Sequence, residues 1–222
     1  MIESPPYFHA EQAAAAVAAG KHVYLAKPIA VDVPGCLTVE SSARKATAKK
    51  LCFLVDFQTR ANKLYQEAVK KVHDGELGRI VLAEANYQCG PTWDQADQLL
   101  RNNPNNPEIR LRSWGVDRAL SGDIITEQNI HAIDVACWML NAQPFGRMAP
   151  AGRLASSSAI VGTISPSFFI DPNDVALSFN SSQACFGYDD IMCRLYGLNG
   201  KPVKCVFDLE LFRSQDTFNS SG

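Results

Sequence analysis

The chain lacks several features that mark particular classes of protein. It has 222 residues and a net charge of −2, so no basic surplus points to nucleic acid or an anionic membrane surface. No apolar run approaches the roughly 20 residues that cross a bilayer. The first nine residues, MIESPPYFH, have neither the basic nor the apolar region of a secretory signal. We therefore expect a cytoplasmic protein that binds neither nucleic acid nor membrane.

Two short patterns are also absent. The seven cysteines are scattered singly, without a Cys-x-x-Cys pair, which excludes zinc-ribbon and thioredoxin-type motifs. Isolated cysteines in odd number are typical of a reducing compartment. Gly-x-Gly does not occur anywhere in the chain, although a dinucleotide-binding turn needs this pattern to approach the pyrophosphate. The GELG sequence at 75–78 follows a predicted helix and is interpreted as a turn.

The first half of the chain alternates between helical and strand patterns. Alanine-rich or amphipathic patterns predict three helices, over 9–20, 33–50 and 62–75. Runs rich in β-formers predict three strands, over 22–26, 51–57 and 79–88. The strand over 51–57 is continuously apolar, as expected of a strand buried on both faces of a parallel sheet. This alternation predicts an α/β fold with parallel strands.

The second half of the chain differs from the first in composition and in its predicted elements. Residues 89–121 are polar and rich in asparagine and proline, and they are interpreted as a long irregular segment of functional importance. One continuous helix is predicted over 122–144. Five β-prone runs follow and predict a mostly antiparallel sheet: 153–164, 174–179, 184–188, 191–197 and 203–212.

Lys27 and Pro28 stand at the end of the first predicted strand. Open α/β sheets bind ligands at the carboxyl ends of their strands. Proline holds the preceding residue extended, and the bond between the two residues can be cis. A candidate functional lysine is one interpretation, and an ordinary lysine in a surface loop is the other.

Glu127, His131 and Asp134 have helical spacing, which predicts that they share one face of the 122–144 helix. Two carboxylates around an imidazole suit general acid–base chemistry, and the same spacing could hold a metal ion. A capped helix with a solvated polar face is the alternative.

Aromatic and basic residues gather in the 89–121 segment. Tryptophan and arginine suit a sugar ring or a carboxylate, and they equally suit a subunit contact. The set consists of Trp93, Arg110, Arg112 and Trp114. Arg60, just after the 51–57 strand, is also placed to enter a binding crevice.

Three segments keep a common order with a known family. These are SPPYFHAEQAAAAVAAGKHVYLAKP, LVDFQTR followed by GELGRI, and GDIITEQNIHAIDVACWML. Together they resemble the Gfo/Idh/MocA oxidoreductases, such as glucose–fructose oxidoreductase and inositol dehydrogenase, over about the first 145 residues. The resemblance implies a partial Rossmann-like parallel sheet in residues 1–57. It also implies an α+β substrate and oligomerisation domain with an open, mostly antiparallel sheet in residues 58–222.

The resemblance also implies chemistry. It implies NAD or NADP as cofactor and hydride transfer at a hydroxyl of a sugar, polyol or glycoside. Lys27 and His131 would lie at the reacting centre, and Glu127, where the family commonly has aspartate, would orient the substrate. Residues implied to contact the cofactor are Ser4, Pro5, His9, Lys27 and Pro28. Residues implied to contact the substrate are Arg60, Trp93, Glu127 and Asp134. No metal site is implied, and a homo-oligomer through the C-terminal sheet is expected.

The chain departs from the family pattern in two respects. The first strand and glycine turn of the Rossmann domain are missing, so a fragment is expected, incomplete also at its C-terminus, with weak or lost cofactor binding. Ala26 stands where the family has glutamate in Glu-Lys-Pro, so Lys27 is expected to lack a neighbouring carboxylate. One alternative is a non-catalytic relative that binds sugars or forms oligomers. Another is a metal-dependent lyase or isomerase that uses Glu127, His131 and Asp134.

Overall fold

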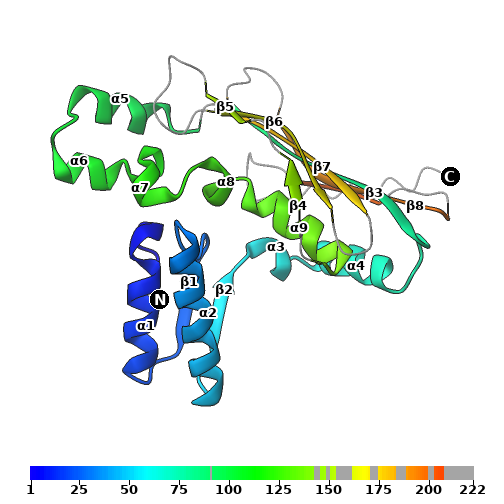
Figure 1. The fold of residues 1–222 in the computed structure, drawn as a ribbon, viewed down its shortest axis with the longest axis horizontal. Coiled ribbons are helices and arrows are strands. Elements are labelled where there is room, and N and C mark those ends of the chain that lie inside the picture. The colour runs from blue at the N-terminus through cyan, green and yellow to red at the C-terminus, as the bar shows by residue number, and fades with distance from the viewer. Residues whose placement is uncertain are drawn as a thin grey trace. The chain divides into compact units, whose positions relative to one another are not determined.

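The computed structural model describes residues 1–90, 92–142, 146–148, 151–153, 162–170, 175–183, 189–199 and 203–207. These residues form two compact units (Figure 1). The first contains Met1–Phe57 and Trp93–Gln128, and the second contains Gln58–Thr92 and most of the described residues from Asn129 onward. A domain boundary at residue 57 stays a prediction. Residues 93–128 belong to the same compact unit as residues 1–57.

The first unit begins with the predicted α/β alternation. Its elements are η1 (Pro6–Phe8), α1 (His9–Ala18), β1 (Val23–Ala26), α2 (Val33–Ala48) and β2 (Phe53–Asp56). Strands β1 and β2 pair in parallel, from Val23 opposite Phe53 to Ala26 opposite Asp56. On the other edge of β1, Ile2 forms a parallel bridge with Leu25. The prediction of a parallel sheet in this part of the chain is confirmed.

One face of this small sheet is buried and the other is not. Val23 and Leu25 of β1 pack with Phe53 of β2 against helix residues such as Val17 and Val39. On the opposite face Leu54 is 57% exposed. The prediction that the 51–57 strand is buried on both faces is therefore wrong. An apolar run shows that a strand can be buried, but it does not show how many helices cover it.

Residues 93–128 are helical, so the prediction of an irregular segment is wrong. The elements are α5 (Asp94–Asn102), α6 (Pro107–Arg112), η2 (Trp114–Val116), α7 (Arg118–Ser121) and α8 (Ile124–Glu127). Asn106 caps α6 by accepting the backbone N–H groups of Glu108 and Ile109. Asp117 caps α7 in the same way. Short helices need many capping residues, and asparagine, aspartate and proline at helix starts gave the segment the composition of a loop.

Asp117 supplies a first test of this helical segment. Burial tends to raise its pKa, but hydrogen bonds from Arg110 and from the backbone N–H of Ala119 hold that pKa below its ordinary value of 3.8. We expect Asp117→Ala to lower the free energy of unfolding by about 1–2 kcal/mol, because it removes both the cap and the ion pair. Asp117→Asn keeps the cap, so a smaller loss is expected.

The pH dependence of the same variants follows from the lowered pKa. A carboxyl with a lowered pKa stabilises the fold above its ordinary value, and this contribution is lost as the pH falls through the folded pKa. The difference between wild type and Asp117→Ala in urea unfolding should therefore shrink below about pH 4. A difference that stays constant down to acid pH would contradict the ion pair.

The second unit is a mixed sheet with helices on one face. The helices are α3 (Gln58–Ala61), α4 (Lys63–His73) and α9 (Ile130–Leu140). The strands are β3 (Ile80–Gln88), β4 (Gly146–Met148), β5 (Ala151–Arg153), β6 (Gly162–Ile170), β7 (Ala176–Ser182), β8 (Asp190–Gly197) and β9 (Val203–Phe207).

The strand order is β4-β6-β7-β3-β8-β9, with β5 also paired to β6. Only β3 and β7 pair in parallel among these strands, so the prediction of an open, mostly antiparallel sheet is confirmed. The predicted run over 184–188 lies outside the described residues, as does most of 153–164.

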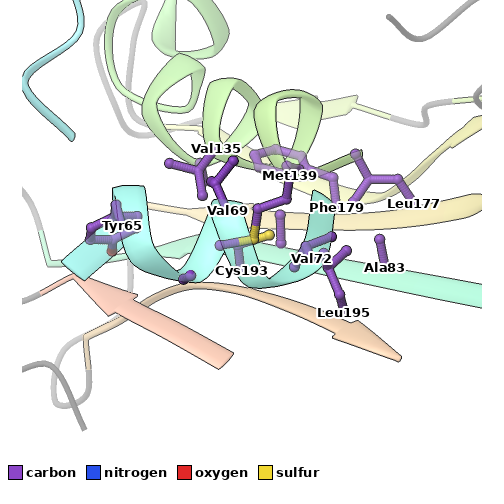
Figure 2. Close-up of a cluster of buried hydrophobic side chains, with 14 of the residues drawn as sticks. Tyr65, Val69, Val72, Ala83, Val135, Met139, Leu177, Phe179, Cys193 and Leu195 are labelled. Atoms are coloured by element: carbon purple, nitrogen blue, oxygen red, sulfur yellow. The ribbon is translucent and has the colours of Figure 1, made fainter. Parts of the chain in front are cut away.

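Helices α4 and α9 cover one face of this sheet. Figure 2 shows Val69 and Val72 of α4, with Val135 and Met139 of α9, directed towards the strands. Their partners are Ala83, Leu177, Phe179, Cys193 and Leu195. Polar groups lie at other positions of β3 and β8, where Glu84 accepts a hydrogen bond from the Tyr196 hydroxyl at 2.7 Å. An oligomer through this sheet stays a prediction.

Within the part of the chain that the structure describes, no helix is both long and apolar enough to cross a membrane.

Candidate active site

Lys27 lies at the carboxyl end of β1, and its bond to Pro28 is cis. The Lys27 ammonium donates hydrogen bonds to Glu127 Oε1, at 2.8 Å, and to the Glu127 backbone carbonyl. Both residues belong to the first unit, although 100 positions separate them in the sequence. The expectation that Ala26 leaves Lys27 without a neighbouring carboxylate is therefore wrong, because Glu127 supplies one from α8.

A tight turn brings α8 to this position. Gly122 ends α7 with φ +85°, a left-handed conformation that favours glycine. A β-carbon at Gly122 would lie 3.0 Å from the Val31 α-carbon and 2.6 Å from the Thr126 hydroxyl oxygen. The absence of a side chain at Gly122 thus lets the turn before α8 approach the segment that follows Lys27.

We expect Gly122→Ala to lower the free energy of unfolding by about 2 kcal/mol. The alanine would have to keep a left-handed backbone conformation, and its β-carbon would also press against the backbone of Val31. Gly20→Ala is the matched control, since Gly20 also has a positive φ but a β-carbon there would meet nothing within 4 Å. The control should lose only about 1 kcal/mol in the same urea unfolding measurement. Equal losses in the two variants would contradict the close approach to Val31.

Glu127 is an unusual carboxylate because it is only 5% exposed. Burial raises its pKa above the ordinary 4.5, while the charge and hydrogen bond of Lys27 oppose this shift without cancelling it. Its Oε1 accepts from Lys27, but its Oε2 has no hydrogen-bond partner among the described residues. A buried acceptor without a donor is costly, so this atom is suited to receive a hydroxyl group.

Helix 122–144 is predicted as one element, but the chain is not helical at Gln128 and Asn129, between α8 and α9. Glu127 ends α8 in the first unit, while His131 and Asp134 lie on α9 in the second. The prediction that Glu127 shares a helix face with His131 is therefore wrong. Asn129 is fully buried, and its side-chain oxygen accepts a hydrogen bond from the Ser181 hydroxyl at 2.9 Å. This bond ties the start of α9 to β7.

Arg60 and Asp134, both predicted to contact substrate, are paired with each other. The Arg60 guanidinium donates two hydrogen bonds to the Asp134 carboxylate, at 2.9 and 2.8 Å. It also lies 5.1 Å from the ring centre of Trp138. The hydrogen bond with Asp134 raises the pKa of Arg60 despite partial burial. This bidentate pair joins α3 to α9, and a role in substrate binding stays a prediction.

Trp93, the third predicted substrate contact, packs inside the helical segment of the first unit. Its ring meets that of Trp114 edge-on, with 5.8 Å between centroids. A β-carbon at Gly115 would lie 2.7 Å from the Trp93 ring, so the glycine lets the indole lie against the backbone. Arg110 and Arg112 are paired with Asp117 and Glu108, respectively.

A groove of about 500 Å³ lies beside this aromatic pair. It is lined by Ser4, Pro5, Phe8, Gln12, Glu108, Leu111, Arg112 and Trp114. The sequence prediction included Ser4 and Pro5 but missed Phe8, Gln12 and Leu111, which carry no pattern that separates them from core or surface residues. The groove therefore adds an aromatic and apolar wall to the segment that contains Ser4 and Pro5.

His9 connects the two segments that carry the predicted cofactor contacts. It is 1% exposed, with Nδ1 2.8 Å from the Pro28 carbonyl oxygen and Nε2 2.7 Å from the Ser4 carbonyl oxygen. Both ring nitrogens are thus engaged by backbone groups. Among the described residues, no group of three histidine, cysteine, aspartate or glutamate side chains is arranged to hold a metal ion.

Comparisons with known proteins give one family. Residues 65–202 match the GFO/IDH/MocA C-terminal domain. A levoglucosan dehydrogenase of Pseudarthrobacter phenanthrenivorans is 31% identical over 63% of this chain and 32% of its own. An inositol 2-dehydrogenase of Rhizobium meliloti is 26% identical over 85% of this chain and 52% of its own.

The fold agrees with these similarities. The WlbA dehydrogenase of Bordetella pertussis, solved in complex with NADH and UDP-GlcNAcA, superposes with a TM-score of 0.75 at 17% identity. This likeness covers 93% of this chain and 54% of that protein. The chain spans about a third to about half of the length of the relatives it matches. Because the matched domain covers more than half of its residues, the chain belongs to the GFO/IDH/MocA family.

Proposed function

We propose that this chain carries part of the active site of an NAD(P)-dependent oxidoreductase that acts on a hydroxyl group of a sugar, polyol or glycoside. The observation that carries the proposal is the pair of a partly buried Lys27 with a buried Glu127 at the carboxyl end of β1. Strand ends of parallel sheets are where α/β proteins bind their ligands. The relatives named as dehydrogenases of levoglucosan and inositol support this substrate class.

The residues at this strand end suit the nicotinamide and ribose part of such a cofactor. Glu127 Oε2 is a buried acceptor without a donor in the described part of the chain, and a ribose or substrate hydroxyl is a donor of the right kind. The Lys27 ammonium, whose side chain is 19% exposed, stands beside this atom. Ser4 and Pro5 line the groove described above, and His9 links Ser4 to Pro28, the residue after Lys27. The chain has no Gly-x-Gly turn, so the proposal concerns this end of the cofactor and not its phosphates.

Each protein group has a distinct role in the proposed reaction. A bound oxidised nicotinamide would supply a hydride acceptor for the carbon that carries the reacting hydroxyl. Lys27 would donate a hydrogen bond to the hydroxyl oxygen and stabilise the negative charge that develops there. Glu127 would accept a hydrogen bond from a neighbouring hydroxyl and so orient the ring. His131, four positions after Glu127, would take the hydroxyl proton as general base.

The proposal is tested by offering NAD⁺ and NADP⁺ with a panel of cyclic polyols, aldoses and glycosides, and following formation of the reduced nicotinamide. We expect turnover with at least one polyol or sugar and a preference for one of the two cofactors. Lys27→Met should abolish this turnover, and Lys49→Met, which removes a lysine bound to the Val17 carbonyl, should preserve it. A protein that binds sugars in calorimetry but reduces neither cofactor would support a non-catalytic relative instead.

A further inference from the structure

His9 makes two contacts that one neutral imidazole cannot both satisfy. Its Nδ1 and Nε2 atoms face the carbonyl oxygens of Pro28 and Ser4 at 2.8 and 2.7 Å. A carbonyl oxygen only accepts hydrogen bonds, and a neutral imidazole carries a single N–H group. In the neutral form, one nitrogen lone pair would therefore point at an oxygen lone pair.

We infer that His9 is a buried imidazolium cation whose two N–H groups clamp the Ser4 and Pro28 carbonyls and so position Lys27. Both distances lie in the range of charge-assisted hydrogen bonds. Two carbonyl dipoles then stabilise the charge. Of the charged groups next to these segments, Lys27 is bound to Glu127, and Asp32 accepts the Gly35 N–H. None of the carboxylates in the described part of the chain forms an ion pair with His9.

The clamp holds two segments where their backbone pairing has ended. Ile2 donates its N–H to the Tyr24 carbonyl and accepts from the Ala26 N–H, so the N-terminal segment pairs with β1 up to Ala26. Beyond this point His9 joins Ser4 to Pro28. Because Pro28 directly follows Lys27, the clamp fixes the backbone from which the lysine extends. His9 is thus a positioning residue, and its link to catalysis rests on the function proposed above.

His22 provides an internal reference, because one of its ring nitrogens carries no proton. Its Nδ1 accepts the backbone N–H of Cys52 at 2.8 Å, so this nitrogen must carry a lone pair and not a proton. The chain has four histidines, which keeps their spectrum simple. The structure thus assigns opposite protonation patterns to His9 and His22.

Long-range ¹H–¹⁵N correlation spectra of the histidine-labelled chain test the inference about one pH unit above the ordinary histidine pKa of about 6.5. We expect both ring nitrogens of His9 to give imidazolium-type signals, while His22 gives one protonated and one bare nitrogen. His22→Gln, His73→Gln and His131→Gln assign the spectrum by elimination, so a folded His9 variant is not required. A bare nitrogen at His9 would overturn the inference, whether or not the protein is a dehydrogenase.

A second measurement tests the positioning role. His9→Gln keeps an amide donor for the carbonyls, whereas His9→Phe keeps a ring of similar shape but removes both donors. Where the proposed activity is present, we expect His9→Phe to lower kcat by roughly 10–10²-fold, as misplacement of a catalytic group does, and His9→Gln to recover part of this loss. Equal kcat values for wild type and His9→Phe would overturn the positioning role, while the spectra would still decide the charge of His9.

Discussion

Replacing Lys27 with methionine is expected to lower the free energy of unfolding by about 3 kcal/mol at neutral pH. The reason is that Glu127, only 5% exposed, then becomes a buried carboxylate without a partner. Methionine keeps much of the lysine side-chain volume, so the loss reports mainly on charge. Lys70→Met is the matched control, because the Lys70–Asp74 pair is exposed to solvent and should contribute little to stability.

The size of this loss should depend on pH in a defined direction. Burial raises the pKa of Glu127, and removing Lys27 removes the groups that oppose this shift. The folded variant then binds more protons than the unfolded chain between pH 4.5 and the raised pKa. Its stability must therefore increase relative to wild type as the pH falls towards 4.5, and the penalty is largest above the folded pKa.

The double variant Lys27→Met/Glu127→Leu separates this explanation from a simple packing defect. With both charges gone, no unpaired ion is buried, and most of the stability should return. Urea unfolding of the wild type, both single variants and the double variant gives the coupling energy directly. Additive losses, with no recovery in the double variant, would contradict a coupled Lys27–Glu127 pair.

His131→Ala is expected to lower kcat by at least about 10²-fold, the usual contribution of a general acid or base. The expected effect on stability is small by comparison, because His131 is only partly buried. His73→Ala is the matched control in the same unit, since His73 is exposed and its Nε2 lies 3.1 Å from the Trp138 carbonyl oxygen. A decrease of less than a few-fold for His131→Ala would assign this histidine a structural role.

Local patterns in the sequence predicted the elements that local physics determines. These elements depend on neighbours a few positions away in the sequence. They include the alanine-rich helix before β1, the lysine at the end of that strand, and the alternation of more and less buried residues along β3. The family resemblance combined these local patterns and led to the correct family. The sequence left the cis form open for the bond between Lys27 and Pro28 without choosing it, and the bond is cis.

The predictions that failed depend on distant parts of the chain. Nothing near Ala26 reveals that Glu127 supplies the carboxylate from 100 positions away. The break at Gln128 and Asn129 depends on a unit boundary and on a contact of Asn129 with Ser181, neither of which a helical period reports. The exposed face of β2 depends on which helices cover it. In each case tertiary packing overrides a local preference.

Isotope transfer from a substrate deuterated at its hydroxyl-bearing carbons shows whether the site around Lys27 moves a hydride to the nicotinamide. The active polyol or sugar from the substrate panel is incubated with NAD⁺ or NADP⁺, and the nicotinamide is analysed by mass spectrometry. We expect one deuterium on the reduced nicotinamide with wild type and none with Lys27→Met. Substrate conversion without deuterium on the nicotinamide, or equal transfer by the Lys27→Met variant, would contradict hydride transfer at this site.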